Sequence, residues 1–360
     1  MYVGRVPDDR DPSAPLAVFP FVVGCPRSGT TLLQAMLHAH PELAVPPESH
    51  FILRLARGFG DGWHGSAKVG RFADLLFAGR RFAYWRMPRE RVVALLEHEQ
   101  PVDVAAAIRL LYASWSERAG KRRYADKTPR YVTHIESLAA LFDEARFIHL
   151  IRDGRDVALS LAESFDRGPQ TAAQAALYWA ARVGAGRSQG LALGPDRYLE
   201  IRYEALVSNP DETLRTVCEF IDLPFHVAML EPRQRAAEIV TGYPDPGVHE
   251  NLGQSLAMRR DWRRAMPQRE LRNFELFAAG LLAELSYPVE MVERGTGACD
   301  GERIAVLERE FSGLRDLRFR AARQAARRGE RLRRRQSSRW ARLGAGLNRY
   351  IIGIRPRRRS

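Results

Sequence analysis

Hydrophobic positions along this chain of 360 residues follow two alternating patterns. Short apolar runs predict buried strands at 17–23 and 146–151, with a third strand in 197–206 and a short one that ends at Lys127 and Thr128. Apolar residues spaced three and four apart predict helices at 30–40, 129–141, from 153, 170–193, 209–224 and 268–286. Strands that alternate with helices indicate an α/β fold, a parallel sheet covered by helices on both faces.

Two regions depart from this alternation. Residues 51–120 have a helical pattern with many aromatic residues, which we interpret mainly as core and also as the wall of an acceptor pocket. From residue 301 the chain reads as an amphipathic helix and then an arginine-rich tail. The predicted organisation is a flexible N-terminus at 1–16, a domain at 17–295 with 51–120 as a helical insertion, and a basic helical extension at 301–360.

The net charge of +13 comes from the tail. Residues 301–360 hold 19 arginines and five acidic residues, a balance of +14, against −1 for the rest of the chain. The body therefore gives no sign of nucleic-acid binding. Three interpretations of the tail stay open: a solvated helix with a disordered end, a segment that binds the anionic inner face of a membrane, and a nucleic-acid contact.

Composition limits the compartment and the class of site. No apolar run approaches the roughly 18 residues of a membrane-spanning helix. The polar, proline-rich N-terminus does not read as a secretory signal peptide. Three widely spaced cysteines (Cys25, Cys218 and Cys299) suggest neither disulfides nor a zinc site. We therefore expect a cytoplasmic protein without a metal.

The loop after the first strand, in FVVGCPRSGTTLL, is typical of an anion-binding site. Gly24 and Gly29 take the two glycine positions of a P-loop, G-x-x-x-x-G-K-[ST]. Thr30 replaces the P-loop lysine, and Arg27 supplies a positive charge earlier in the loop. Because backbone N–H groups at a helix start attract anions, this stretch predicts a cradle for a phosphate group.

A second anion site is predicted in FIHLIRDGRDVALS. Arg152 ends a strand, and Ser160 lies eight residues further on, about two helical turns away. Open parallel sheets bind ligands at the carboxyl ends of their strands, so this pair is expected at the same sheet edge as the first loop. Two separate phosphate sites indicate a nucleotide with two phosphate groups, the second on its ribose.

These stretches, with PPESHF, DKTP and IRYEALVSNP, resemble the P-loop sulfotransferases that use 3′-phosphoadenylyl sulfate (PAPS), in a bacterial branch similar to the protein-tyrosine and heparan-type enzymes. The resemblance covers about residues 18–290. It implies transfer of a sulfuryl group to a hydroxyl of a carbohydrate, lipid or peptide. It also implies a donor site made of Pro26, Arg27, Ser28, Gly29, Thr30, Thr31, Arg152, Ser160 and Tyr203.

The same resemblance implies the catalytic residues. Arg27 and Lys127 are expected to stabilise the leaving phosphate oxygen, and Glu48 is expected to be the general base. Alternatives stay open at each position: Glu48 as a helix cap, His50 as the base, and Lys127 as a partner of Asp126 or Glu48. A sulfuryl group carries less negative charge than a phosphoryl group, so the chemistry has less need of Mg²⁺.

Other polar residues receive weaker assignments. His149 is expected to be a core histidine. Arg155 and Asp156 are expected to form a surface pair, with a contact of Arg155 to the nucleotide as the alternative. Cytosolic small-molecule enzymes have lysine where this chain has Arg27, which points away from phenol and steroid acceptors. A late loop that closes over the nucleotide in relatives gives three further candidates, Ser255, Arg259 and Arg260.

Two other function classes compete with sulfuryl transfer. A P-loop kinase or NTPase using ATP and Mg²⁺ would need the lysine that Thr30 replaces, and an acidic metal ligand at a strand end. A binding module that acts through the basic tail would not use the near-neutral body.

Overall fold

The computed structural model describes residues 17–60, 62–65, 67–164, 169–232 and 260–291. Within these residues the centre is a parallel sheet of four strands in the order β4-β1-β5-β6. The strands are β1 (Phe19–Gly24), β4 (Asp126–Lys127), β5 (Ala145–Ile151) and β6 (Tyr198–Arg202). The predicted parallel α/β sheet is confirmed, and the N-terminal segment 1–16 and the basic extension 301–360 lie outside the described residues.

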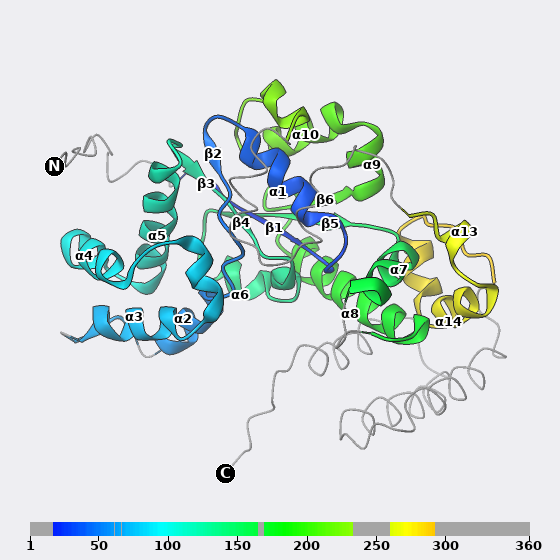
Figure 1. Cartoon of the computed structure of the whole chain (residues 1–360), viewed down its shortest axis with the longest axis horizontal. Coiled ribbons are helices and arrows are strands. Elements are labelled where there is room, and N and C mark those ends of the chain that lie inside the picture. Colours follow the sequence, from blue (N-terminus) through cyan, green and yellow to red (C-terminus); the bar gives the residue numbers. More distant parts are fainter. Residues whose placement is uncertain (1–16, 61, 66, 165–168, 233–259, 292–360) are drawn as a thin grey trace, which may run out of the picture.

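Helices cover both faces of the sheet, as Figure 1 shows. One face packs against α1 (Thr30–Ala39), α9 (Tyr203–Ser208), α10 (Pro210–Phe220) and η3 (Val227–Leu230). The other face packs against the 3₁₀ helix η2 (Pro129–Thr133), α6 (Ile135–Ala139), and α8 (Ala172–Leu191). Alternate residues of β1 serve the two faces, because Phe21 and Val23 belong to one buried cluster and Val22 to another.

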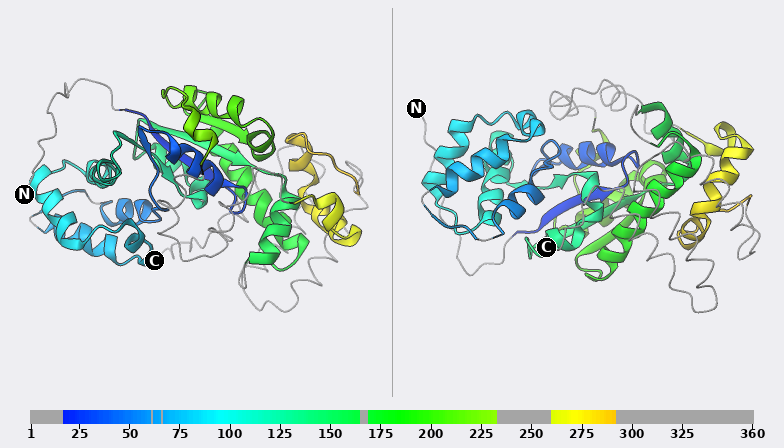
Figure 2. Two further views of the ribbon diagram at one scale, coloured as in Figure 1. Left: turned by 45° about the horizontal axis from the view of Figure 1, so that its top comes forward. Right: turned by 90° about the horizontal axis from the view of Figure 1, so that it is seen from below.

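Helices rich in aromatic residues form one end of the molecule, opposite α13 (Trp262–Ala265) and α14 (Gln268–Glu284), as Figure 2 shows. They are α2 (Ile52–Gly58), α3 (Lys68–Phe77), η1 (Arg80–Trp85), α4 (Arg89–Glu99) and α5 (Val104–Arg118). Buried rings there include Phe51, Phe72, Phe82 and Trp85, which form part of the hydrophobic core. A short pair, β2 (Leu43–Ala44) with β3 (Arg123–Tyr124), was not predicted.

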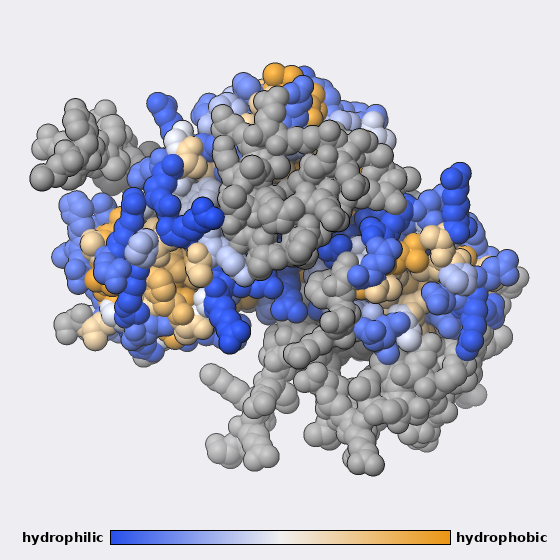
Figure 3. Space-filling view, in the orientation of Figure 1, coloured by the Kyte–Doolittle hydropathy of each residue, from blue (hydrophilic) through white to orange (hydrophobic). Residues whose placement is uncertain are grey.

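Several predicted bounds need correction. The helix expected over 129–141 is divided at His134 into η2 and α6. The strand expected over 197–206 ends at Arg202, and a helix starts at Tyr203. Asn209 takes the N-cap position before Pro210, but its side chain makes no capping hydrogen bond. On the face seen in Figure 3, apolar side chains gather over α3 to α5 and near α13 and α14, with polar side chains around each area.

Candidate functional site

The first loop connects β1 to α1 by a tight path that two glycines permit. A Cβ atom on Gly24 would lie 2.6 Å from the Leu150 carbonyl oxygen of the neighbouring strand. Gly29 has φ +94°, and a Cβ there would lie 2.4 Å from the Tyr203 ring. Gly29 is also the N-cap of α1 and has no side chain to cap the N–H groups of the first turn. The N–H groups of Leu32 and Leu33 donate to the Gly29 carbonyl oxygen, so within the described residues those of Thr30 and Thr31 remain available to an anion.

The side chains of this loop differ in exposure. Ser28 and Thr30 are buried, whereas Pro26, Arg27 and Thr31 are half-buried. The Ser28 hydroxyl makes no hydrogen bond to any described residue. Because a buried polar group without a partner is costly, this hydroxyl fits a ligand oxygen.

The second sequence motif meets the first loop directly. Arg27 Nε donates to Ser160 Oγ at 3.0 Å across a separation of 133 residues. Ser160 lies on α7 (Gly154–Ser164), which follows β5, and its exposed fraction is 2%. Arg27 has φ +77°, a left-handed conformation that is uncommon for an arginine. The loop thus orients Arg27 toward the helix of the second motif.

Arg152 lies on the same side of the sheet, directly after β5. Its guanidinium carbon lies 4.4 Å from the Tyr203 ring centroid, and that ring covers Gly29. Arg152 is 4% exposed, and its Nε and Nη2 make no hydrogen bond within the described residues. Its ion pair with Asp156 is long, 3.7 Å between Nη2 and Oδ2. Arg152 therefore retains hydrogen-bonding capacity for an anion.

The candidate base and the candidate lysine form an ion pair. Lys127 Nζ donates to Glu48 Oε1 at 2.8 Å, and Lys127 is 1% exposed. Lys127 ends β4, beside Val22 of β1. Its fixed position follows from the strand, whereas Glu48 belongs to the segment before α2. The alternative pairing of Lys127 with Glu48 is therefore the one found, and Lys127 also approaches the carboxyl edge of the sheet.

Two further side chains contact the second carboxylate oxygen of Glu48. His50 Nε2 lies 2.7 Å from Oε2, and Arg81 Nη1 donates to Oε2 at 3.0 Å. Burial alone would raise the pKa of Glu48, but the Lys127 ammonium and the His50 contacts outweigh burial and hold the pKa well below its usual range. Glu48 is thus a carboxylate at neutral pH. Helix α2 begins at Ile52, so Glu48 is not its cap.

Buried hydroxyl groups fix the segment that carries Glu48. Thr128 Oγ1 accepts from the Ser49 backbone N–H at 3.0 Å, and Tyr131 OH accepts from Ser49 Oγ at 3.0 Å. Asp126 accepts from Thr128 Oγ1 at 3.2 Å and from Tyr112 OH at 2.6 Å. Burial raises the pKa of Asp126. These bonds connect the segment around Glu48 to the end of β4 and position its carboxylate against Lys127.

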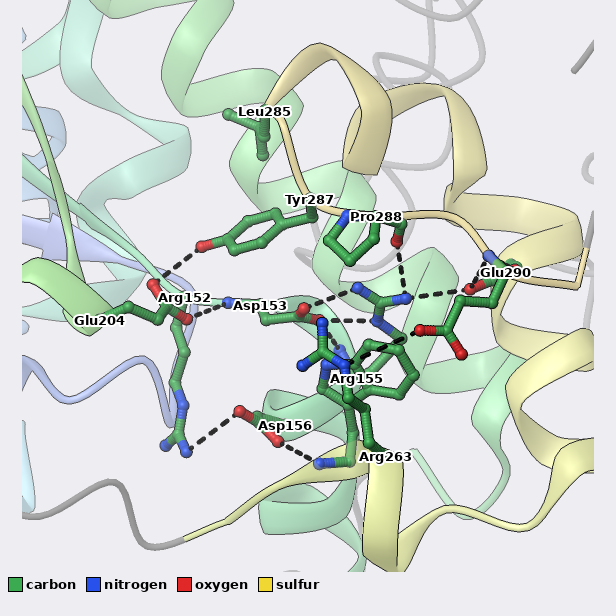
Figure 4. A network of polar contacts seen from close by, with 12 residues as sticks. Arg152, Asp153, Arg155, Asp156, Glu204, Arg263, Leu285, Tyr287, Pro288 and Glu290 are labelled. Carbon is green, nitrogen blue, oxygen red and sulfur yellow. Dashed lines mark hydrogen bonds and ion pairs between the residues drawn. The ribbon is translucent and has the colours of Figure 1, made fainter.

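The expected surface pair of Arg155 and Asp156 is wrong. Arg155 is fully buried and belongs to a polar network next to Arg152, shown in Figure 4. It donates to both carboxylate oxygens of Asp153 and to Glu275 at 3.0 Å. Asp156 instead pairs with Arg152 and accepts from the Trp262 backbone N–H at 3.0 Å. The sequence pattern did not reveal that these side chains are buried, because α13 and α14, which cover them, are distant in sequence.

The structure describes two of the remaining candidates, His149 and Arg260. His149 is a core histidine, fully buried with Nδ1 2.6 Å from Tyr198 OH, and burial lowers its pKa to about 3. Arg260 forms an ion pair with Glu163 at the surface of α7. Ser255 and Arg259 lie outside the described residues. Arg81 was missed by sequence reasoning, because nothing in its local pattern distinguishes it from a solvated arginine.

The described residues contain neither a candidate membrane span nor a candidate metal site. None of the helices there is both long and apolar enough to cross a membrane. None of the His, Cys, Asp and Glu side chains there gather in a group that could hold a metal ion.

Comparison with known proteins identifies similar sequences. Residues 20–227 match the profile described as the sulfotransferase family. The chain is 30% identical over 324 residues to nodulation protein NoeE of Sinorhizobium fredii, covering 83% of this chain and 73% of that protein. It is 27% identical over 216 residues to the protein-tyrosine sulfotransferase of Drosophila melanogaster, covering 58% of this chain and 39% of that protein.

A solved structure has a similar fold. The sulfotransferase domain of the Synechococcus PCC 7002 olefin synthase superposes with a TM-score of 0.54 and 24% identity, covering 78% of this chain and 99% of that domain. At this identity the likeness concerns the fold. It agrees with the parallel sheet and the helical layers described above.

Proposed function

The chain belongs to the sulfotransferase family, and on that premise we propose that it moves the sulfuryl group of PAPS to a hydroxyl acceptor, a carbohydrate, lipid or peptide. One observation carries the proposal: both motifs hold buried polar atoms that have no hydrogen-bond partner among the described residues. They are Ser28 Oγ in the first motif, and Arg152 Nε and Nη2 in the second. The Arg27–Ser160 hydrogen bond joins the two motifs. Such a set suits a ligand with two phosphate groups.

Each donor group has a proposed task. The amide N–H groups of the loop, with the hydroxyls of Ser28, Thr30 and Thr31, hold the 5′-phosphosulfate end of PAPS. Arg152 and Ser160 hold the 3′-phosphate, and Tyr203 keeps the Arg152 guanidinium in place by stacking against it. These tasks need no metal ion, since positive charge and N–H donors are supplied by the chain itself.

The chemical step is an in-line displacement at sulfur. A bond forms between the acceptor oxygen and sulfur while the bond from sulfur to the 5′-phosphate oxygen breaks, and Glu48 accepts the acceptor proton. Arg27 and Lys127 stabilise the negative charge that develops on the leaving phosphate oxygen. As Lys127 turns toward that oxygen, its attraction for Glu48 weakens and the pKa of Glu48 rises. The ion pair thereby links leaving-group stabilisation to base strength.

Ligand binding tests the proposal directly. We expect the desulfated nucleotide PAP to raise the unfolding temperature without Mg²⁺, because it binds only the folded state. ATP with Mg²⁺ should give the larger shift if the chain is a kinase, and that result would overturn the proposal. Incubation with labelled PAPS and a fractionated extract of the source cell, followed by mass spectrometry, then identifies the acceptor.

Glu48 has a test of its own. The variant Glu48→Gln keeps the hydrogen bond from Lys127 but cannot accept a proton. We expect kcat to fall by about 10²- to 10⁴-fold with the acceptor found in the extract, while PAP affinity changes little. His50→Gln is the matched variant for the alternative base. A large loss in His50→Gln with an unchanged rate in Glu48→Gln would move the base to His50.

The proposed compartment is the cytoplasm. Cys25 and Cys218 are buried free thiols, and burial raises the pKa of Cys25 to about 12 and of Cys218 to about 11, so neither is a reactive thiolate. A reducing compartment is the ordinary setting for such residues.

A further inference from the structure

A buried arginine near the first loop has no ion pair with the described residues. Arg182 of α8 is 4% exposed, and its hydrogen bond and its ring contact are both to Tyr178 of its own helix. Nη1 donates to the Tyr178 carbonyl oxygen at 3.2 Å, and the guanidinium carbon lies 3.4 Å from the Tyr178 ring centroid. Arginine keeps its charge in proteins, so a full positive charge is buried there.

The position of Arg182 relates it to the reacting end of the site. Trp179, one turn earlier on α8, donates from Nε1 to the Arg152 carbonyl oxygen at 3.1 Å. Trp179 and Val183 share a buried cluster with Cys25, the first residue of the donor loop. Because residues three and four apart lie on one helix face, Arg182 lies on the face of α8 that meets the carboxyl end of β1.

A second arginine adds to this positive charge. Helix α8 packs against η2, which carries Arg130, three residues beyond Lys127. Arg130 is exposed; burial is the main cause that lowers the pKa of Arg182, and the charge of Arg130 lowers it further. Within the part of the chain that the structure describes, neither guanidinium forms an ion pair. Two positive charges, one buried and one facing solvent, attract an anion to this part of the molecule.

The donor nucleotide does not account for this pair. Its phosphate groups already have Arg27 with the loop N–H groups, and Arg152 with Ser160. We propose that Arg182 and Arg130 bind a negatively charged group of the acceptor, so that the acceptor is a hydroxyl compound that also carries a carboxylate, phosphate or sulfate group. This inference rests on the proposed function, since it names the substrate class of that same site.

Inorganic phosphate is the probe for this site. The full chain is first saturated with PAPS in the absence of acceptor, which fills the donor positions, and phosphate is then titrated while the unfolding temperature is followed. We expect phosphate to raise the unfolding temperature of the wild-type complex further. In Arg182→Gln the apparent phosphate affinity should fall at least about tenfold, the loss of one charge-assisted hydrogen bond.

Two further variants complete the design. Arg130→Gln changes an exposed side chain and should also weaken phosphate binding. If Arg182→Gln does not fold, this variant tests whether the two arginines bind the anion. Arg269→Gln removes the same charge from an exposed position on α14 and should leave phosphate binding unchanged.

The outcomes separate this inference from the proposed function. Absence of any PAP or PAPS binding overturns the proposed function itself. Normal nucleotide binding with a phosphate response that persists in Arg182→Gln and Arg130→Gln overturns only the anionic acceptor. A loss of PAP affinity in Arg182→Gln of about tenfold also overturns it, because Arg182 then belongs to the donor site.

Discussion

Two buried arginines, Arg155 of α7 and Arg182 of α8, have opposite surroundings. Arg155 has hydrogen bonds to Asp153, Glu275 and the Pro288 carbonyl oxygen, and its guanidinium carbon lies 3.6 Å from the Trp262 ring centroid. Arg182 has a ring and a carbonyl oxygen of its own helix and no carboxylate within the described residues. Both side chains are at most 4% exposed.

The difference teaches how this fold distributes stability and function. The Arg155 guanidinium and the carboxylates of Asp153 and Glu275 compensate one another, so the network joins β5, α7 and α14 and stabilises the carboxyl edge of the sheet (Figure 4). Near the first loop, Arg152 keeps two guanidinium nitrogens without a hydrogen-bond partner among the described residues, and we propose that a ligand uses them. Buried charge without compensation lowers stability, and it is retained where a ligand supplies the counter-charge.

The largest expected effect follows from removal of the compensated arginine. Arg155→Met leaves Asp153 and Glu275 buried without their cation. We expect the free energy of unfolding to fall by about 3–5 kcal/mol, measured by urea denaturation. Arg269→Met, at an exposed site, is the control and should change it by less than about 0.5 kcal/mol. A comparably small loss in Arg155→Met would remove the contrast between the two regions.

Arg27 provides the opposite case, a charge for which we propose a role in the chemistry. Arg27→Ala should lower kcat by about 10²- to 10³-fold, because the charge at the leaving oxygen is lost. Its stability should fall only slightly, by about 1 kcal/mol, because the substitution removes the hydrogen bond to Ser160, while alanine and arginine meet the left-handed backbone with the same Cβ. Arg27→Lys restores the charge without the Nε donor that reaches Ser160, and should recover part of the rate. Full activity in Arg27→Ala would show that the leaving group needs no charge from this loop.

Much of the fold was predictable, whereas the state of its charges was not. Periodicity placed β1, β5, α1, α8 and α14 within a few residues, because each pattern is a local property of the chain. Glu48 and Lys127, 79 residues apart, were singled out by resemblance, and the ion pair was one of several alternatives. Arg182 could not be recognised, because its significance lies in the lack of a carboxylate among neighbours brought by distant segments.

Asp156 contacts both Arg152 and the backbone of Trp262 at the start of α13. Its ionisation should make the stability of the fold depend on pH. Burial is the main cause that raises the pKa of Asp156 to about 6, above its unfolded value near 4. A carboxyl with a raised folded pKa stabilises the fold while protonated. That contribution is present below about pH 4 and is lost as the pH rises from 4 to 6. In Asp156→Asn the amide oxygen still accepts the Trp262 N–H.

Denaturation curves from about pH 4 to about pH 8 compare the two proteins. Relative to Asp156→Asn, the wild type should lose stability between pH 4 and 6, with a slope of at most about 1.4 kcal/mol per pH unit, and the difference should level off above pH 7. Asp153→Asn is not a suitable control because it disrupts the Arg155 network. Parallel curves over the whole range would mean that Asp156 titrates alike in the folded and unfolded states.

The smallest effect, and the one that most sharpens the comparison, is expected in Arg182→Met. Methionine fills similar space beside Tyr178 and Cys25 and removes a buried charge that has no acidic partner. The free energy of unfolding of the ligand-free protein should lie between no change and a gain of about 1 kcal/mol. The same measurement on Arg155→Met gives the matched buried-arginine control. If both substitutions lower the free energy of unfolding by about 3 kcal/mol or more, then Arg182 is a structural residue. Its charge is then stabilised by the folded chain itself and not by a ligand.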